Sequence, residues 1–330
     1  MERVTIIVDA RDRFSTTTKC LETLFANTPQ AIDVIVVIGG APEHLKREWQ
    51  TAFGNRARFI FKDQFINQPQ ARNIGLREAK TRLAVQIDND NFVRPGWLEA
   101  LVRCQQETNA VLVVPVILER PDRIHTAGND LYITKDQGKT HAYKHLRYFG
   151  MPYGEGANMK RQRTDYSELH CQLVVVEPTL RLGANDEAII EVGEVDQGLT
   201  FAKAGYEMWF EPASVVHYAL RCPVEADDIR FFAWRWDLRR VDEGYRYFER
   251  KWGMDVSEHG TFRDWLVRYN AQIGLLPRLW PTAAAIKLDQ KLGELRERVT
   301  DLMLFPKYRF QRLRKRQLGY YDWTAGVSKS

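Results

Sequence analysis

The sequence predicts an α/β fold in which a mostly parallel sheet is flanked by helices, followed by a C-terminal helical extension. Over the first two thirds of the chain, short apolar runs alternate with longer helical stretches. These runs are apolar at nearly every position, as expected for parallel strands that are buried on both faces. After about residue 222 the apolar residues recur instead at three- and four-residue steps, which is the period of an amphipathic helix.

The expected strands and helices alternate in order. The strands are residues 4–8, 34–38, 58–61, 83–87 and 111–118, and strand character returns at 172–176 and 208–210. The helices between them are residues 16–25, 43–53, 70–79 and 95–107. Ser15 or Thr16 is a candidate N-cap of the first helix, and Pro95 suits the first turn of the last one. Residues 120–168 are polar and lack a clear period, so we expect a substrate-facing insert that sets acceptor specificity.

The C-terminal third is expected to be helical. Its apolar positions from Ile229 to Trp252 follow a helical period, and Gly253 is placed to end that helix. Residues 261–272 and 283–304 are further helix candidates. We therefore predict two domains, residues 1–222 and a helical region at 223–330.

Composition narrows the class of protein. With 330 residues, 44% hydrophobic and 28% charged, the chain is an ordinary folded protein and neither disordered nor fibrous. Its net charge of +5 suits a polyanionic ligand such as a nucleotide diphosphate, or an anionic membrane surface. The four cysteines are scattered without metal-ligand spacing, as in a reduced compartment. No apolar secretory region precedes the first strand and no stretch reaches the ~18 apolar residues of a spanning helix, so we expect a cytoplasmic protein.

Acidic side chains follow the strand at residues 83–87. Asp88, Asn89 and Asp90 come directly after it, and ligands of open α/β sheets bind at the carboxyl ends of the strands. Carboxylates together with substrate phosphates are what Mg²⁺ and Mn²⁺ prefer. Asp and Asn are also common in turns, so an acidic turn before the next helix is the alternative interpretation.

Several motifs accompany these acids in a fixed order. Ala71-Arg72-Asn73-Ile74-Gly75 precedes them and Trp97-Leu98 follows. Farther along the chain come Gly193-Glu194-Val195-Asp196, Ala204-Gly205-Tyr206, Pro212-Ala213-Ser214-Val215-Val216-His217 and Lys251-Trp252-Gly253. In order and spacing, residues 1–253 resemble the family-2 glycosyltransferases of the GT-A fold, which share an A-R-N, a D-x-D, an E-D-x-D, an A-G-Y and a V-x-H motif.

The resemblance implies an inverting transfer of sugar from a nucleotide-sugar donor to an acceptor hydroxyl, on a glycan or a lipid-linked acceptor. It also implies a divalent cation, Mn²⁺ or Mg²⁺. By position, Asp88, Asn89, Arg72 and Asn73 would lie beside the donor, and Asp90 would bind the metal. His217 matches a histidine that binds the metal in some relatives, although a histidine at a strand end is more often a hydrogen-bonded rim residue.

The same resemblance places the catalytic base. Glu194 falls on the aspartate of the family's E-D pair and Gly193 on its glutamate, so a single longer carboxylate stands where two acids are usual. Glu194 is our candidate general base, with Asp196 as the second candidate and Glu191 as the third. An exposed carboxylate at a helix N-terminus is the alternative for Glu194.

The base-binding region also departs from the family. Relatives carry an acid just after the second strand, whereas this chain reads Gly39-Gly40-Ala41-Pro42 there. Asp9 and Arg11, at the end of the first strand, are therefore our candidates for donor recognition, and a uridine donor does not follow from the sequence.

The basic and aromatic residues between 307 and 323 leave three interpretations open: a solvated helix, a peripheral contact with the inner membrane face, or a grip on nucleic acid. We expect no nucleic-acid partner.

Other functions are disfavoured or kept as alternatives. No glycine-rich loop follows the first strand, which disfavours a nucleotidyltransferase or a dinucleotide-binding dehydrogenase. The altered acid pair leaves a degenerate GT-A domain, acting as a non-catalytic scaffold, as the alternative function.

Overall fold

The computed structural model describes residues 2–28, 32–120, 122–154, 158–219 and 224–256, and scattered positions between 262 and 292. The chain divides into two compact units, Met1–Gly260 and Thr261–Ser330. The described positions inside the predicted helices 261–272 and 283–304 are helical, and α10 spans Leu275–Leu279. The basic and aromatic segment at 307–323 lies outside the described residues. In the part of the chain that is described, no helix is both long and apolar enough to span a bilayer.

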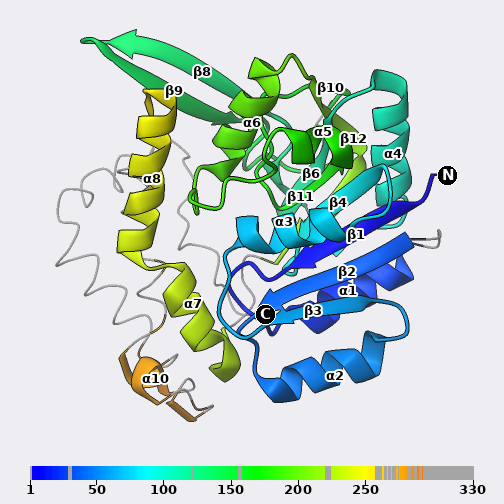
Figure 1. Ribbon diagram of the computed structural model, residues 1–330, viewed down its shortest axis with the longest axis vertical. Helices are drawn as coiled ribbons and strands as arrows, with labels where there is room; N and C mark the ends of the chain where they lie inside the picture. Colours follow the sequence, from blue (N-terminus) through cyan, green and yellow to red (C-terminus); the bar gives the residue numbers. More distant parts are fainter. Residues whose placement is uncertain are drawn as a thin grey trace. The chain divides into compact units, whose positions relative to one another are not determined.

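The first unit is built on a mixed sheet with a mostly parallel centre (Figure 1). Its order over the described residues is β10-β12-β6-β11-β4-β1-β2-β3, with β5 beside β12 and β7 beside β6. The central strands β1 (Val4–Asp9), β2 (Ile32–Gly39), β3 (Arg58–Lys62) and β4 (Leu83–Asp88) are parallel, as are β6 (Leu112–Arg120) and β12 (Met208–Tyr218). β11 (Cys171–Val175) lies antiparallel between β4 and β6. The expected mostly parallel α/β sheet is thus confirmed.

Helices cover both faces of this sheet, and the strands alternate between them. Val4, Ile6 and Val8 of β1 pack with α1 (Thr17–Ala26), α2 (Glu43–Phe53) and α4 (Trp97–Thr108). Ile7, from the opposite face of the same strand, packs with α3 (Gln68–Glu78), α5 (Val176–Arg181) and α6 (Gly193–Lys203). These apolar side chains of β1 thus pack against helices on both faces of the sheet, which is why the strand is apolar at all but Thr5 and Asp9.

The register of the sheet brings two predicted site residues together. β1 pairs with β4 so that Asp9 lies opposite Asp88, at the carboxyl ends of both strands. β5 (Asn91–Val93) then turns the chain back along the end of β12. The loop at Asn89-Asp90 consequently projects over this edge of the sheet.

Residues 120–168, for which the sequence predicts a substrate-facing insert but no particular strands, contain regular structure. They contain β7 (Arg123–Thr126), β8 (Asn129–Asp136), β9 (Lys139–Leu146) and β10 (Gln162–Arg163). β8 and β9 form a long hairpin, which pairs with the short β13 (Asp255–Val256) (Figure 1). Its two-residue turn, Gln137-Gly138, has φ of 47° and 79°, the left-handed conformation that hairpin turns require. The sequence did not predict these strands because much of the hairpin is exposed on both faces, so its polar side chains show no alternation with apolar ones.

The helical stretch after residue 222 is broken into two helices. α7 (Ile229–Arg235) follows the short turn η1 (Ala226–Asp228), and α8 (Leu238–Trp252) begins after Asp237, whose side chain accepts from the Arg239 amide at 2.9 Å. Gly253, with φ of 64°, ends α8 as predicted. Asp228 accepts hydrogen bonds from the Phe14 and Ser15 amides at 2.6 and 3.1 Å, which joins η1 to the loop after β1.

These contacts explain why the first compact unit continues to residue 260 instead of stopping near 222. The end of the catalytic domain at residue 222 stays a prediction.

Gly75 lets α3 lie close against β1. A Cβ atom at this position would come within 2.3 Å of Ile7 Cγ2, far inside van der Waals contact. We expect Gly75→Ala to destabilise the protein by about 1–3 kcal/mol, because overpacking forces side chains and backbone to shift. Chemical denaturation measures the change. In an Ile7→Ala background the same substitution is expected to cost much less, and an equal cost in both backgrounds would contradict the clash.

Candidate active site

Three aspartates meet at the carboxyl ends of β1 and β4, and Arg72 lies among them. Arg72 Nε donates to Asp9 Oδ1 at 3.0 Å, and its Nη2 lies 2.6 Å from Asp88 Oδ1. The side chains of Arg72, Asp9 and Asp88 are essentially inaccessible to solvent. A buried guanidinium thus bridges two buried carboxylates, a geometry that arginine supports with its fixed fork of donors.

Local sequence explains why Arg72 reaches this place. Asn67 and Gln70 form a capping box that fixes the start of α3, and Pro69 occupies its first turn. Gly75 lets the helix approach β1 closely. Arg72 also donates to the carbonyl oxygen of Leu169, the residue just before His170, so it joins three separate segments of the chain.

Arg11 provides a second cation beside Asp90. Its Nη1 lies 3.8 Å from Asp90 Oδ2 and also donates to the Tyr218 hydroxyl. The guanidinium lies 5.0 Å from the centroid of the Tyr218 ring, within cation–π range. Asp90 Oδ1 accepts from Asn91 at 2.9 Å.

The other two predicted donor residues hold the backbone. Asn89 accepts from the Arg11 amide at 3.2 Å and donates to Thr17 Oγ1 at 2.8 Å, so its side chain fixes the loop after β1. Asn73 points to the loop of residues 183–187, where it accepts from the Asn185 amide at 2.9 Å. The structure therefore gathers Asp9, Arg11, Arg72, Asp88 and Asp90 at one edge, while Asn73 lies on the far side of α3.

His170 joins this edge, and sequence reasoning missed it. It precedes β11, whose antiparallel register sets the His170 carbonyl against the Asp88 amide at 3.0 Å. Asp88, Asp90 and His170 each offer a ligand atom, and these atoms lie within 4.8 Å of one another. His217 lies elsewhere and accepts from Arg94 Nε at 2.7 Å. No sequence pattern marks His170, since only the direction of β11 brings it to the aspartates.

The electrostatics of this group suit a cation. His170 Nδ1 is buried with no hydrogen-bond partner among the described residues, and it lies 3.6 Å from Asp88 Oδ2. Burial lowers the pKa of His170 to about 4, so its imidazole is neutral and able to bind a metal. Burial raises the pKa of Asp90 and of Asp9, and the charges of Arg11 and Arg72 oppose this rise. Burial also opposes ionisation of Asp88, but the charge of Arg72 keeps its pKa below the usual value.

Glu194 lies in the first turn of α6 and faces the hairpin. Lys144 of β9 donates to Glu194 Oε1 at 3.1 Å and lies 3.7 Å from Glu168 Oε1. Burial raises the pKa of Glu194 to about 7, the range in which a carboxylate works well as a general base at neutral pH. Val192, the residue before Gly193, has φ of 59°, which is strained for a β-branched side chain.

Asp196 lies on another side of α6, because residues two apart on a helix point about 200° apart. Its Oδ1 accepts from Trp252 Nε1 at 2.7 Å and lies 2.7 Å from Lys251 Nζ. The Lys251-Trp252-Gly253 motif therefore ties the end of α8 to α6. Glu191 is likewise paired, at 2.5 Å from Arg235 Nη2.

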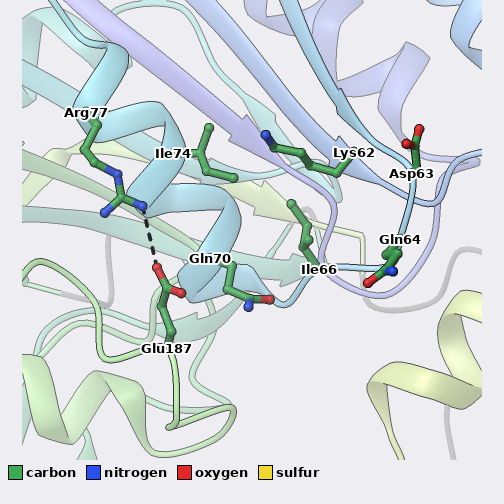
Figure 2. Close-up of a pocket in the computed structure, with 8 residues that line it drawn as sticks. All are labelled: Lys62, Asp63, Gln64, Ile66, Gln70, Ile74, Arg77 and Glu187. Atoms are coloured by element: carbon green, nitrogen blue, oxygen red, sulfur yellow. Dashed lines mark ion pairs between the residues drawn. The ribbon is translucent and has the colours of Figure 1, made fainter.

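The outer face of α3 borders a separate hollow of about 390 Å³ (Figure 2). Gln70, Ile74 and Arg77 line it from α3, and Lys62 lines it from the end of β3. Arg77 forms a 3.6 Å ion pair with Glu187 across it. Asp9, Asp88 and Asp90 are not among the residues that line this hollow.

We expect Arg72→Met to destabilise the fold by about 3–5 kcal/mol, because the substitution leaves two buried carboxylates without their common partner. Urea denaturation measures this change. Arg77→Met, on the exposed face of the same helix, is the matched control and is expected to cost less than about 1 kcal/mol. Equal effects of both substitutions would contradict the bridging role of Arg72.

The fold is that of the GT-A class of proteins. Over 81% of its length the chain resembles "Crystal structure of GalNAc-T7 with UDP, GalNAc and Mn2+", with a TM-score of 0.53, 17% sequence identity and 55% of that chain covered. The chain itself belongs to glycosyl transferase family 2, whose sequence model matches residues 5–169.

A curated relative is the "Glycosyltransferase GlyG" of Streptococcus pneumoniae serotype 4 (strain ATCC BAA-334 / TIGR4), 27% identical over 116 residues. That match spans 34% of this chain and 38% of GlyG, so this chain matches well under half of that protein.

Proposed function

We propose that this glycosyltransferase is metal-dependent and inverting, and that it moves a sugar from a nucleotide-sugar donor to an acceptor hydroxyl of a glycan or a lipid-linked molecule. The observation that carries the proposal is the buried group of Asp88, Asp90 and His170 at the carboxyl ends of the strands. Ligands of open α/β sheets bind at this edge.

Asp90 and His170, with Asp88 beside them, are the residues that would hold the cation. A bound Mn²⁺ or Mg²⁺ would neutralise the charge of the departing diphosphate. The imidazole favours Mn²⁺, because Mg²⁺ prefers oxygen ligands. The similar crystal structure of GalNAc-T7 contains UDP, GalNAc and Mn²⁺, which supports Mn²⁺ as the cation. His217 was the histidine predicted for this role, but its bond to Arg94 makes His170 the better candidate.

Arg11, Arg72 and Asp9 would bind the donor around the metal. Arg11 lies beside Asp90 and has a guanidinium that suits phosphate oxygens. Asp9 Oδ2 is buried with no hydrogen-bond partner among the described residues, so it is free to accept from a ribose or base donor. Asn73 and Asn89 would act indirectly, by holding the backbone of the site.

Glu194 would act as the general base. In a direct displacement the acceptor oxygen forms a bond to the anomeric carbon, the bond from that carbon to the diphosphate breaks, and the hydroxyl proton passes to a Glu194 oxygen. This single displacement inverts the anomeric centre. Asp196 is the weaker candidate because its Oδ1 is already bound by both Lys251 and Trp252.

We further propose a cytoplasmic enzyme whose segment at 307–323, outside the described residues, contacts the inner face of the membrane. Basic and aromatic residues together suit an anionic membrane surface.

The donor site is tested by thermal shift with UDP, GDP, dTDP and CDP and their sugar conjugates, with and without Mn²⁺. A ligand at 100 times its dissociation constant stabilises the native state by about 2.7 kcal/mol. We expect a metal-dependent rise in Tm for one nucleotide family. Asp90→Asn should abolish the rise, and Asp63→Asn, an exposed acid, should leave it intact. A folded protein without any shift would overturn the proposed donor site.

The pH profile of sugar transfer tests the base. Glu194 accepts a proton only when ionised, so kcat/KM should fall about tenfold per pH unit below about pH 7 and level off above it. Lys144→Met removes a positive charge that favours the ionised form of Glu194. The pH below which kcat/KM falls should therefore move to a higher value. Lys135→Met, an exposed lysine of the same hairpin, is the control. If kcat/KM of Lys144→Met falls at the same pH as in the unaltered protein, the assignment of Glu194 as the base is contradicted.

Glu194→Gln should lower kcat by about 10²–10⁴-fold, since the amide cannot accept the proton. If Glu194→Gln stays active with an unchanged pH profile of kcat/KM, another residue must be the general base.

A further inference from the structure

A second group of metal-binding side chains lies next to the acidic edge. His125, Glu168 and His170 each offer a ligand atom within 4.8 Å of the others. His125 lies on β7, and Glu168 and His170 lie on the segment that enters β11. The group thus contains two imidazoles and one carboxylate, and it meets the first group only through His170. The proposed sugar transfer uses only His170 of this group, and the inference rests on that proposed function only through this residue.

The second observation is a carboxylate that orients His125. Glu119 Oε2 lies 3.4 Å from His125 Nδ1, and its side chain is only 8% exposed. When Nδ1–H donates to this carboxylate, Nε2 is left as the free lone pair of the ring. A metal-binding imidazole usually donates its other ring N–H to a carboxylate, which fixes the tautomer and the ring orientation.

The remaining two members of the group have buried atoms that lack hydrogen bonds. Glu168 Oε1 and His170 Nδ1 find no hydrogen-bond partner among the described residues. Glu168 Oε1 forms a 3.7 Å ion pair with Lys144 Nζ, but this separation is too long for a hydrogen bond. Unsatisfied buried polar atoms are costly, and each calls for an explanation such as a bound ion.

Aromatic rings lie beside this group, the buried Tyr218 and the more exposed Phe149. The Tyr218 ring lies 4.2 Å from the His170 ring and 5.3 Å from the His125 ring, centroid to centroid, and Phe149 lies 6.0 Å from His125. An apolar wall limits access of water and strengthens the attraction between a cation and its ligands.

We propose that His125, Glu168 and His170 form a second site for a divalent transition metal, which shares His170 with the donor-metal group of Asp88, Asp90 and His170 and therefore competes with it for this imidazole. Two imidazoles and a carboxylate select ions such as Zn²⁺, Co²⁺ or Mn²⁺ over Mg²⁺ and Ca²⁺. Ligand atoms around such an ion lie roughly 3–3.5 Å apart, given bonds of about 2.1 Å. Because the ligand atoms all lie within 4.8 Å of one another, the side chains need to close by no more than about 2 Å when the ion binds.

The test separates the two sites by working in Asp90→Asn, which removes the donor metal. Zn²⁺ is titrated in competition with a chromophoric chelator, and Co²⁺ is followed by its visible absorption. We expect one ion per chain, with a Co²⁺ spectrum of nitrogen and oxygen ligation. His125→Ala in this background should abolish binding, and Glu168→Gln should weaken it at least tenfold. His145→Ala, an exposed histidine of the hairpin, should change nothing.

Glu119→Gln measures the orienting carboxylate without removing a ligand, and about a 10- to 100-fold loss of Zn²⁺ affinity is expected. The proposal fails if Asp90→Asn binds no Zn²⁺, or if His125→Ala and Glu168→Gln bind it as tightly as the His145→Ala control. Either result would leave the donor site untouched, because the nucleotide-dependent shift in the unaltered protein reports on that site separately.

Discussion

The buried bridge from Arg72 to Asp9 and Asp88 is the interaction on which the rest of the site depends. Two carboxylates at the ends of adjacent parallel strands would repel each other in a low-dielectric interior, and the sheet register leaves them opposite one another. A single guanidinium offsets that repulsion and reaches the Leu169 carbonyl as well. α3 must therefore lie close to β1, which requires a residue without a side chain at Gly75. The contacts of Arg72 with the two aspartates and the close packing of α3 on β1 therefore depend on each other.

The antiparallel strand β11 decides what else meets this edge. In an all-parallel sheet the residue before a strand lies at the amino edge, far from the carboxyl ends. Because β11 runs in the opposite direction, the segment before it arrives beside Asp88 and brings Glu168 and His170 with it. The same reversal supplies a neutral imidazole to the acids. A mixed sheet thus brings candidate ligands from both ends of its strands together.

The parts of the chain outside the sheet position Glu194. β9 of the hairpin brings Lys144 to Glu194 on one side of α6, and α8 brings Lys251 and Trp252 to Asp196 on another. Contacts on two sides thus hold α6 in place, and Glu194 and Asp196 have different partners. One has a pKa near neutrality through burial, and the other is committed to ion pairing and a hydrogen bond with α8.

The sequence by itself determined the alternating fold, the carboxyl-edge acids and the family, because apolar strand runs and short motifs are local signals. The tertiary structure decided the rest. Nothing local marks His170 as a neighbour of Asp88, nor shows that Asn73 and Asn89 hold backbone instead of facing the site. The polar hairpin of residues 129–146 was missed because strands exposed on both faces lose the two-residue alternation. Strand direction and helix facing are set by packing between distant segments, which no short window of sequence contains.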